Sequence, residues 1–159
     1  MSVITEMTVD SGEFLLGTVL SRDPEADIEL ERAIPATDQV MPYIWVTGRE
    51  LPDFESRVRT SPHVRRLAAV DVVNNQGLYR IEWADDGESL VHGLSETGAT
   101  ILNARGAGTW EFLLQFDDYG GLARFHNYCR RRGIGISLDR VYSPEGIERA
   151  DEDGLRTEL

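Results

Sequence analysis

The sequence contains no lysine, only one cysteine and no long apolar segment. The single cysteine, Cys129, excludes a disulfide within the chain and any metal site built from several cysteines. No stretch approaches the roughly 18 apolar residues of a membrane-spanning helix, so we expect no membrane contact. The first residues lack the basic and apolar regions of a signal peptide. Together these absences predict a cytoplasmic protein.

The absence of lysine comes with a large excess of acid. All 16 basic residues are arginine, against 28 aspartates and glutamates, and the formal net charge is -12. A magnitude of about 2–8 is enough to keep a small domain soluble. Carboxylate repulsion destabilises a compact chain unless salt screens it, and at molar salt the screening length falls to about 3 Å. We therefore interpret the chain as adapted to a salt-rich cytoplasm. The alternative is an ordinary acidic domain that lacks lysine by chance or through high genomic GC content.

The acidic surface also argues against DNA binding by this chain itself, because phosphate contacts need a basic stripe. The longest basic run is Arg130, Arg131 and Arg132, at the end of an expected helix. Positive charge there complements the helix dipole. We read the run as a helix end, with a docking patch for an acidic partner as the alternative. No DNA-binding residue is therefore assigned.

A strand–helix–strand pattern recurs three times, in residues 41–73, 78–105 and 110–142. Each unit has a short strand that carries an aromatic residue, an amphipathic helix and a second apolar strand. Turns rich in asparagine or glycine separate the units. The aromatic residues at equivalent places are Trp45, Trp83 and Phe116. The alternative is an ordinary α+β domain in which short units look alike.

The remaining segments complete the predicted architecture. Residues 13–34 are expected to form an N-terminal β-hairpin. Residues 144–159 have the polar, acidic composition of a linker. We therefore predict an α+β domain over residues 1–143 of the ferredoxin-like, split βαβ kind, with helices on one face of a mainly antiparallel sheet.

The candidate motifs for catalysis or metal binding have simpler explanations. The glycines in residues 106–108 precede a strand, so they indicate a hairpin rather than a nucleotide-binding loop. His126 and Cys129 lie three residues apart on one helix, but two ligands do not complete a metal site. Cys129 is better explained as a buried apolar residue. The chain therefore offers no catalytic residue, no metal ligand and no cofactor site.

Two pairs of acids, Asp85-Asp86 and Asp117-Asp118, could in principle perform acid–base chemistry. Each pair lies where a strand gives way to a helix. A carboxylate at that position accepts hydrogen bonds from free backbone N–H groups and favours the positive end of the helix dipole. We interpret both pairs as helix caps.

A family resemblance is carried by the order and spacing of several segments rather than by one motif. The segments are Phe14-Leu15-Leu16-Gly17, Val40-Met41-Pro42-Tyr43, Glu96-Thr97-Gly98-Ala99-Thr100 and Phe125-His126-Asn127-Tyr128-Cys129. With them, the chain as far as Tyr142 resembles the N-terminal regulatory module of bacterio-opsin-activator-type (Bat-type) transcription regulators of halophilic archaea. In that family a C-terminal helix-turn-helix binds DNA, and some members also carry GAF or PAS domains.

The resemblance implies a non-enzymatic domain that senses an effector or mediates dimerisation and biases an attached helix-turn-helix. DNA would then be a partner only through a segment that this sequence does not include. A small-molecule effector, a protein partner or a second copy of the chain would be its direct partners. A stand-alone interaction adaptor, and a small enzyme on a ferredoxin-like scaffold, are the alternatives.

The surface expected to receive such a partner is the open face or edge of the sheet, near Trp45, Trp83 and Phe116. Large aromatic side chains with polar groups suit ligand or partner contacts. The alternative is that these three residues simply pack in the core beneath the helices.

The charge excess leads to a direct prediction. Thermal melts in about 0.1 M and in molar KCl should differ, with a clearly higher midpoint in molar salt, because the carboxylates are then screened. Circular dichroism at a helix wavelength provides the measurement. A midpoint that does not rise with salt would contradict the adaptation to a salt-rich cytoplasm.

Overall fold

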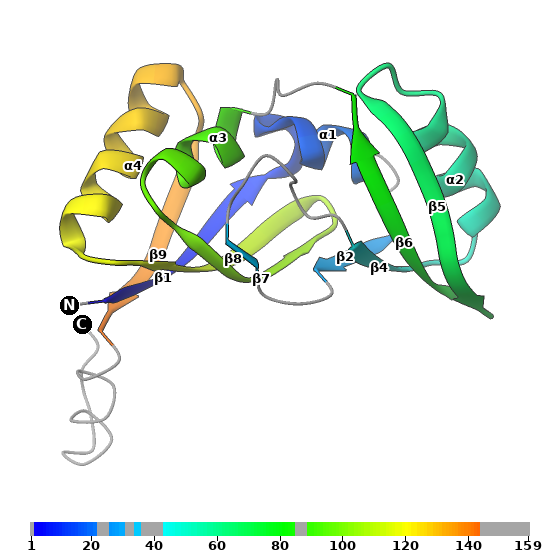
Figure 1. The fold of residues 1–159 in the computed structure, drawn as a ribbon, viewed down its shortest axis with the longest axis horizontal. Coiled ribbons are helices and arrows are strands. Elements are labelled where there is room, and N and C mark those ends of the chain that lie inside the picture. The colour runs from blue at the N-terminus through cyan, green and yellow to red at the C-terminus, as the bar shows by residue number, and fades with distance from the viewer. Residues whose placement is uncertain (1, 22–25, 31–33, 36–42, 85–88, 144–159) are drawn as a thin grey trace, which may run out of the picture.

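The computed structural model describes residues 2–21, 26–30, 34–35, 43–84 and 89–143. In these residues an antiparallel sheet carries helices on one face (Figure 1). The strands are β1 (Val3–Asp10), β2 (Asp27–Leu30), β3 (Ile34–Pro35), β4 (Tyr43–Thr47), β5 (Val64–Val73), β6 (Gln76–Trp83), β7 (Thr100–Gly106), β8 (Thr109–Phe116) and β9 (Ile136–Tyr142). The helices are the 3-10 turn η1 (Ser11–Glu13), α1 (Leu15–Leu20), α2 (Leu51–Arg59), α3 (Ser89–Glu96) and α4 (Tyr119–Arg132).

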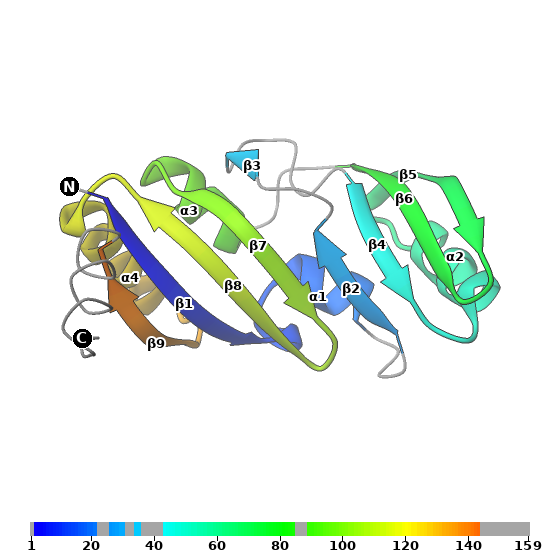
Figure 2. The same cartoon turned by 90° about the horizontal axis from the view of Figure 1, so that it is seen from below.

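The strand order is β5-β6-β4-β2-β7-β8-β1-β9, and the short β3 pairs with β7 off this path. Alternating sequences build the sheet, as β1 illustrates. Val3, Met7 and Val9 are buried beneath the helices. Ile4, Glu6 and Thr8 alternate with them, lie on the opposite face and are half-buried. This pattern is typical of antiparallel strands with one face in the core. Figure 2 shows the opposite, helix-free face, which we call the open face.

The third unit folds as the sequence predicts. Asp118 caps α4 by accepting a hydrogen bond from the Gly121 backbone nitrogen at 2.8 Å. The helix ends at Gly133, whose φ of 71° is the left-handed conformation that glycine adopts readily. Phe125 and Cys129 are fully buried on its inner face. Burial raises the pKa of the Cys129 thiol to about 11, which confirms the expected apolar role.

The element order of all three units is confirmed, and with it the α+β class. In the first and third units one other strand lies between the two strands of the unit: β6 between β4 and β5, and β1 between β8 and β9. The second unit differs, since β4 and β2 separate β6 from β7. That unit instead crosses from one half of the sheet to the other. A ferredoxin-like arrangement of the whole chain stays a prediction.

The expected N-terminal β-hairpin over residues 13–34 is wrong. Its first half forms α1, and its second strand, β2, pairs with β4 and β7 instead. Leu16, Val19 and Leu20 are buried at helical spacing, and the Ser21 backbone nitrogen bonds the Gly17 carbonyl at 2.9 Å. Strand β1, for which no strand was expected, occupies a central place in the sheet between β8 and β9.

Helix α1 is held against the middle of the sheet by an aromatic cluster. The ring of Phe14 meets those of Trp110 and Phe112 edge-on, with centroids 5.6 and 5.8 Å apart. Buried Trp110 donates from Nε1 to Ser21 Oγ at 2.7 Å. A Cβ on Gly106 would come within 2.1 Å of the indole, so only glycine leaves room for it. The cluster therefore ties α1 to β7 and β8.

Three expectations fall outside the described residues: the Asp85-Asp86 cap, the linker over residues 144–159, and the start of the first unit at residues 41–42. Within the described chain, Ile4 near the start of β1 lies opposite Tyr142 at the end of β9. The chain therefore enters and leaves the sheet side by side, at the end opposite β5 (Figure 2).

Candidate functional site

One row of side chains crosses the open face from edge to edge. The strand pairings join its members one strand at a time, and directly opposite residues in antiparallel strands project to the same face. From β5 to β9 the row is Asp71, Leu78, Trp45, Glu29, Arg105, Glu111, Thr8 and Ser137. We call these eight residues the open-face row. Leu78 and Trp45 make the row apolar over β6 and β4. From Glu29 on β2 to Ser137 on β9 all its members are polar or charged.

The polar half of the row borders a shallow hollow of about 370 Å³. The hollow lies over β9, β1, β8, β7 and β2. Its lining residues are Glu6, Met7, Thr8, Glu29, Asn103, Arg105, Glu111, Phe112, Leu113 and Asp139. Ligand sites are usually concave and lined mainly by apolar side chains with a few convergent polar groups. This hollow is concave, but most of its lining residues are polar or charged.

The hollow is dominated by carboxylates. Arg105 is its one cationic residue and lies directly opposite both Glu29 and Glu111 in the sheet. Glu6, on β1, forms an ion pair at 3.6 Å with Arg140, a residue that does not line the hollow. Since carboxylates outnumber the guanidinium, the field in the hollow favours a cationic group. The surface suits recognition of positive charge rather than bond-breaking chemistry.

The hollow reaches the edge strand β9 through Asp139. Its carboxylate accepts hydrogen bonds from the hydroxyls of Thr8 on β1 and Ser137 on β9, the second at 2.9 Å. A cation that competes for Asp139 would therefore act on the pairing of β1 with β9. That strand leads directly to the end of the described chain at residue 143.

The structure does not bring Trp45, Trp83 and Phe116 together. Trp45 belongs to the open-face row, where it is half-buried between Glu29 and Leu78. Trp83 packs against the core at the end of β6. Phe116 is fully buried, with its ring 5.9 Å from that of Phe125. The expected equivalence is wrong because a matching place in each unit does not fix which face of the sheet the residue meets.

Arg130, Arg131 and Arg132 are exposed at the end of α4, on the helix side of the sheet. The guanidinium of Arg132 lies over the ring of Tyr128, 4.7 Å from its centroid. The run is thus on the face opposite the hollow, so the two surfaces are separate candidates.

No group of three or more histidine, cysteine, aspartate or glutamate side chains is placed to hold a metal among the described residues. Sequence reasoning missed the hollow altogether. Its lining comes from five strands, of which only β7 and β8 are neighbours both in the sheet and in the chain, so the full strand order is needed to reveal it. The alternation in β1 and β8 was the one local signal that polar residues share a face.

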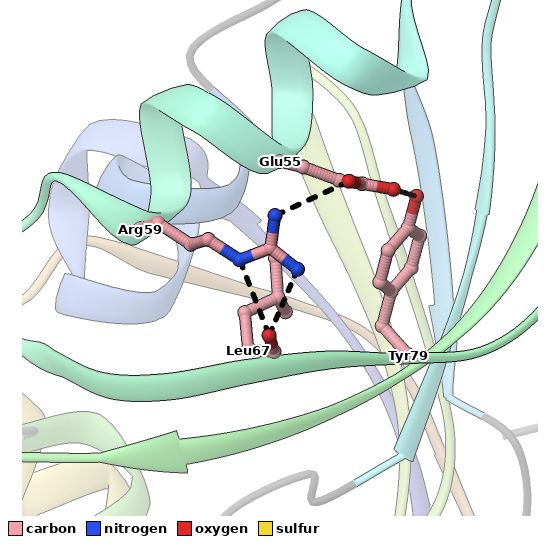
Figure 3. Close-up of polar contacts among 4 residues, drawn as sticks. All are labelled: Glu55, Arg59, Leu67 and Tyr79. Carbon is pink, nitrogen blue, oxygen red and sulfur yellow. Dashed lines mark hydrogen bonds and ion pairs between the residues drawn. The ribbon is translucent and has the colours of Figure 1, made fainter.

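A second polar cluster lies on the helix side, beneath α2 (Figure 3). Buried Tyr79 on β6 donates to Glu55 Oε2 at 2.6 Å, and Glu55 Oε1 pairs with Arg59 Nη1 at 3.2 Å. Arg59 in turn donates to the Leu67 carbonyl on β5 from Nε and Nη2, at 3.3 and 3.0 Å. The cluster fastens α2 to both β5 and β6. It is therefore a structural connection that sets the position of the β5 edge.

The chemistry of Tyr79 follows from this setting. Burial, then the hydrogen bond to Glu55 and its negative charge, raise the pKa of Tyr79 well above the usual value, while Arg59 acts the other way. Gly77 is required nearby, since a Cβ there would approach the Tyr79 ring to 2.7 Å. The neutral hydroxyl is thus the form that the fold stabilises.

Comparison with known protein families assigns the domain that carries these surfaces. Residues 3–143 match the BAT domain, described as the GAF and HTH_10 associated domain. The chain belongs to the BAT domain family. The match confirms the resemblance to bacterio-opsin-activator-type regulators. A search among curated proteins finds none that matches the chain in sequence.

The BAT domain is a regulator-associated domain with no known catalytic function, and its association with HTH_10 implies DNA binding through another domain. In the described part of this BAT domain, no helix has the length and apolar character needed to cross a membrane.

We predict that Tyr79→Phe lowers the free energy of unfolding by about 1–3 kcal/mol at neutral pH, because the hydroxyl bond to a carboxylate is lost. Because the folded-state pKa is raised, the contribution of Tyr79 is fully present below the unfolded pKa of about 10 and is lost as pH rises above it. The gap between wild type and Tyr79→Phe should therefore narrow above pH 10.

Urea denaturation at several pH values measures this gap. Tyr119→Phe, at a residue that is 55% exposed, serves as the matched control and should leave stability nearly unchanged. A gap that stays constant or widens above pH 10 would contradict the role assigned to the Tyr79 hydroxyl.

Proposed function

We propose that this BAT domain is a non-enzymatic regulatory module of a halophilic archaeal transcription regulator, and that it biases an attached helix-turn-helix. The observation that carries the proposal is the match of residues 3–143 to a domain associated with GAF and HTH_10 domains. The acidic, lysine-free composition supports the halophilic and cytoplasmic setting. The stand-alone adaptor differs in that it would act without a DNA-binding domain in the same chain.

The hollow supplies the input in this proposal. A small cationic effector, or a basic segment of a protein partner, would meet Glu29, Glu111 and Asp139 there. Such a ligand can shift the module only if it binds two arrangements with different affinity. Asp139 offers such a difference, because a cation would compete with the Thr8 and Ser137 hydroxyls for its carboxylate.

The output would pass through β9. This edge strand pairs with β1 from Ile136 to Tyr142, with one register shift at Asp139, and ends beside the first strand of the domain. A change in its pairing near Asp139 would alter the direction in which the following segment leaves the sheet. A helix-turn-helix attached there would thereby gain or lose the geometry that places its recognition helix in the major groove.

We predict that residues 1–159 alone give no sequence-specific shift with their own upstream DNA, whereas the chain joined to a helix-turn-helix binds a defined site. A surface at -12 lacks the cationic stripe that supplies non-specific affinity. A mobility-shift titration at the salt concentration that keeps the domain folded makes the measurement. Specific binding by residues 1–159 would contradict the assignment of DNA contacts to another domain.

The regulatory role is tested in the joined chain with Glu111→Gln, which removes one charge from the hollow. This variant should change DNA affinity, or its response to a cationic effector, without changing the melting midpoint. Asp10→Asn, an equal change of charge at an exposed residue outside the hollow, is the control and should have no effect. Equal DNA affinity and response in both variants would contradict an input at the hollow.

A further inference from the structure

The two edge strands of the sheet are finished differently. Strand β9 carries the exposed charges Asp139 and Arg140, and each is engaged with β1, at Thr8 and Glu6. Charged side chains engaged by the neighbouring strand are one means by which natural proteins keep a sheet edge from associating. Register shifts do not distinguish the two edges, since the ladder of β9 with β1 has one and the ladder of β5 with β6 has two.

Strand β5, at the other edge, presents apolar side chains to solvent. Its exposed valines are Val70 at 54%, Val72 at 44% and Val73 at 58%. The strand is ten residues long, the longest in the described chain. A long edge strand with exposed apolar residues is a template for pairing with another strand. We therefore expect this edge to pair with another strand.

We propose that this other strand belongs to a second copy of this chain, with the two β5 strands paired antiparallel about a two-fold axis at Ala68. Such an interface is isologous, so each strand supplies the same residues to the other. Ala68 then lies opposite Ala68 of the second copy, and Leu67 lies opposite Ala69. Small residues at the axis allow the two backbones to approach closely.

The register of the paired strands follows from the face of the sheet on which each β5 side chain already lies. Ala68 faces Arg80 and Arg66 faces Glu82, both on the open face, while Leu67 and Ala69 face the helix side. The shift between Ala69 and Asp71 adds one residue at Val70, which returns Asp71 to the open face opposite Leu78. Antiparallel pairing about Ala68 therefore places Arg66 of each copy opposite Asp71 of the other, on the same face.

This juxtaposition is complementary in charge. Arg66 and Asp71 are both exposed, and neither has an ion-pair partner among the residues that the structure describes. Pairing of two copies forms the contact between Arg66 and Asp71 twice, once on each side of the two-fold axis. In a chain with net charge -12, where most contacts between copies would be repulsive, two opposite-charge pairs select this edge and this register.

Arg59 lies at the same edge and is compatible with the pairing. It donates to the Leu67 carbonyl from α2, on the helix side of the strand. A carbonyl oxygen has two lone pairs, so it can accept a strand N–H in the plane of the sheet as well. The paired strands would make one sheet of both copies, with all helices on a common side. This assembly is independent of any ligand in the hollow.

Charge reversal tests the proposal in the whole chain. Sedimentation velocity over a concentration series, at the lowest salt that keeps the domain folded, should show a reversible dimer. Arg66→Asp and Asp71→Arg should each raise the dimer dissociation constant by about tenfold or more, because two attractive pairs become two repulsive ones. Circular dichroism melts check that both variants are folded.

Mixing the two variants gives the sharpest result. A chain with Arg66→Asp and a chain with Asp71→Arg present opposite charges at both contacts, so the mixture should dimerise more tightly than either variant does alone. The double variant R66D/D71R should also recover the dimer. Arg131→Asp, an equal charge change at the end of α4, should leave the dissociation constant unchanged.

A chain that is monomeric at all concentrations would overturn the proposal. A dimer that is insensitive to both reversals, or a mixture of the two variants that stays monomeric, would equally overturn the β5 interface and its register. None of these outcomes depends on DNA binding, so failure here is distinct from failure of the regulatory role.

Discussion

The integrity of the sheet depends on β2, a strand of four residues. It pairs with β4 at four positions on one side and with β7 at two positions on the other. On one side of it lie β4, β6 and β5 with α2, and on the other lie β7, β8, β1 and β9 with α3 and α4 (Figure 1). Helix α1 lies on the helix side of the sheet beside this narrow connection, and the contacts of Phe14 and Ser21 with Trp110 tie it to β8 (Figure 1).

This connection makes the open-face row continuous. Glu29 is the member of the row on β2, opposite Trp45 on one side and Arg105 on the other. The hollow lies mainly over one half of the sheet, and the free β5 edge belongs to the other. Since interiors are closely packed, a displacement at Arg105 reaches Trp45 through the short β2 ladder and the core beneath it. The open-face row is therefore one connected surface across both halves of the sheet.

The sequence predicted local features well and non-local ones poorly. The cap at Asp118, the end of α4 at Gly133 and the burial of Cys129 are each determined by residues within one or two turns of the helix. The place of β1 between β8 and β9 depends on residues more than a hundred positions away, which no local pattern reports. Helix α1 was mistaken for a strand because its six residues are almost all apolar, and such a short run has no decisive period.

The candidate site shows the same division. Arg105 and Glu111 face each other across the hairpin that the glycines of residues 106–108 predict, whereas Thr8 joins them only through the order of the strands. Conversely, the three aromatic residues that the sequence singled out are distributed between the open face and the core, since a shift in pairing or a change of phase reverses the face of a strand residue. The alternation in β1 and β8 was present in the sequence, but it gave no neighbour for either strand.

The central claim is that the domain is one cooperative unit joined through β2. Native-state hydrogen exchange, measured residue by residue across a series of low denaturant concentrations, tests it most directly. The slowest amides of β6 and of β8 should exchange with the same free energy and the same denaturant dependence, and those of β2 should join them. Exchange of β4, β5 and β6 at a clearly lower free energy than β8 would show that the two halves open separately and would contradict communication across the sheet.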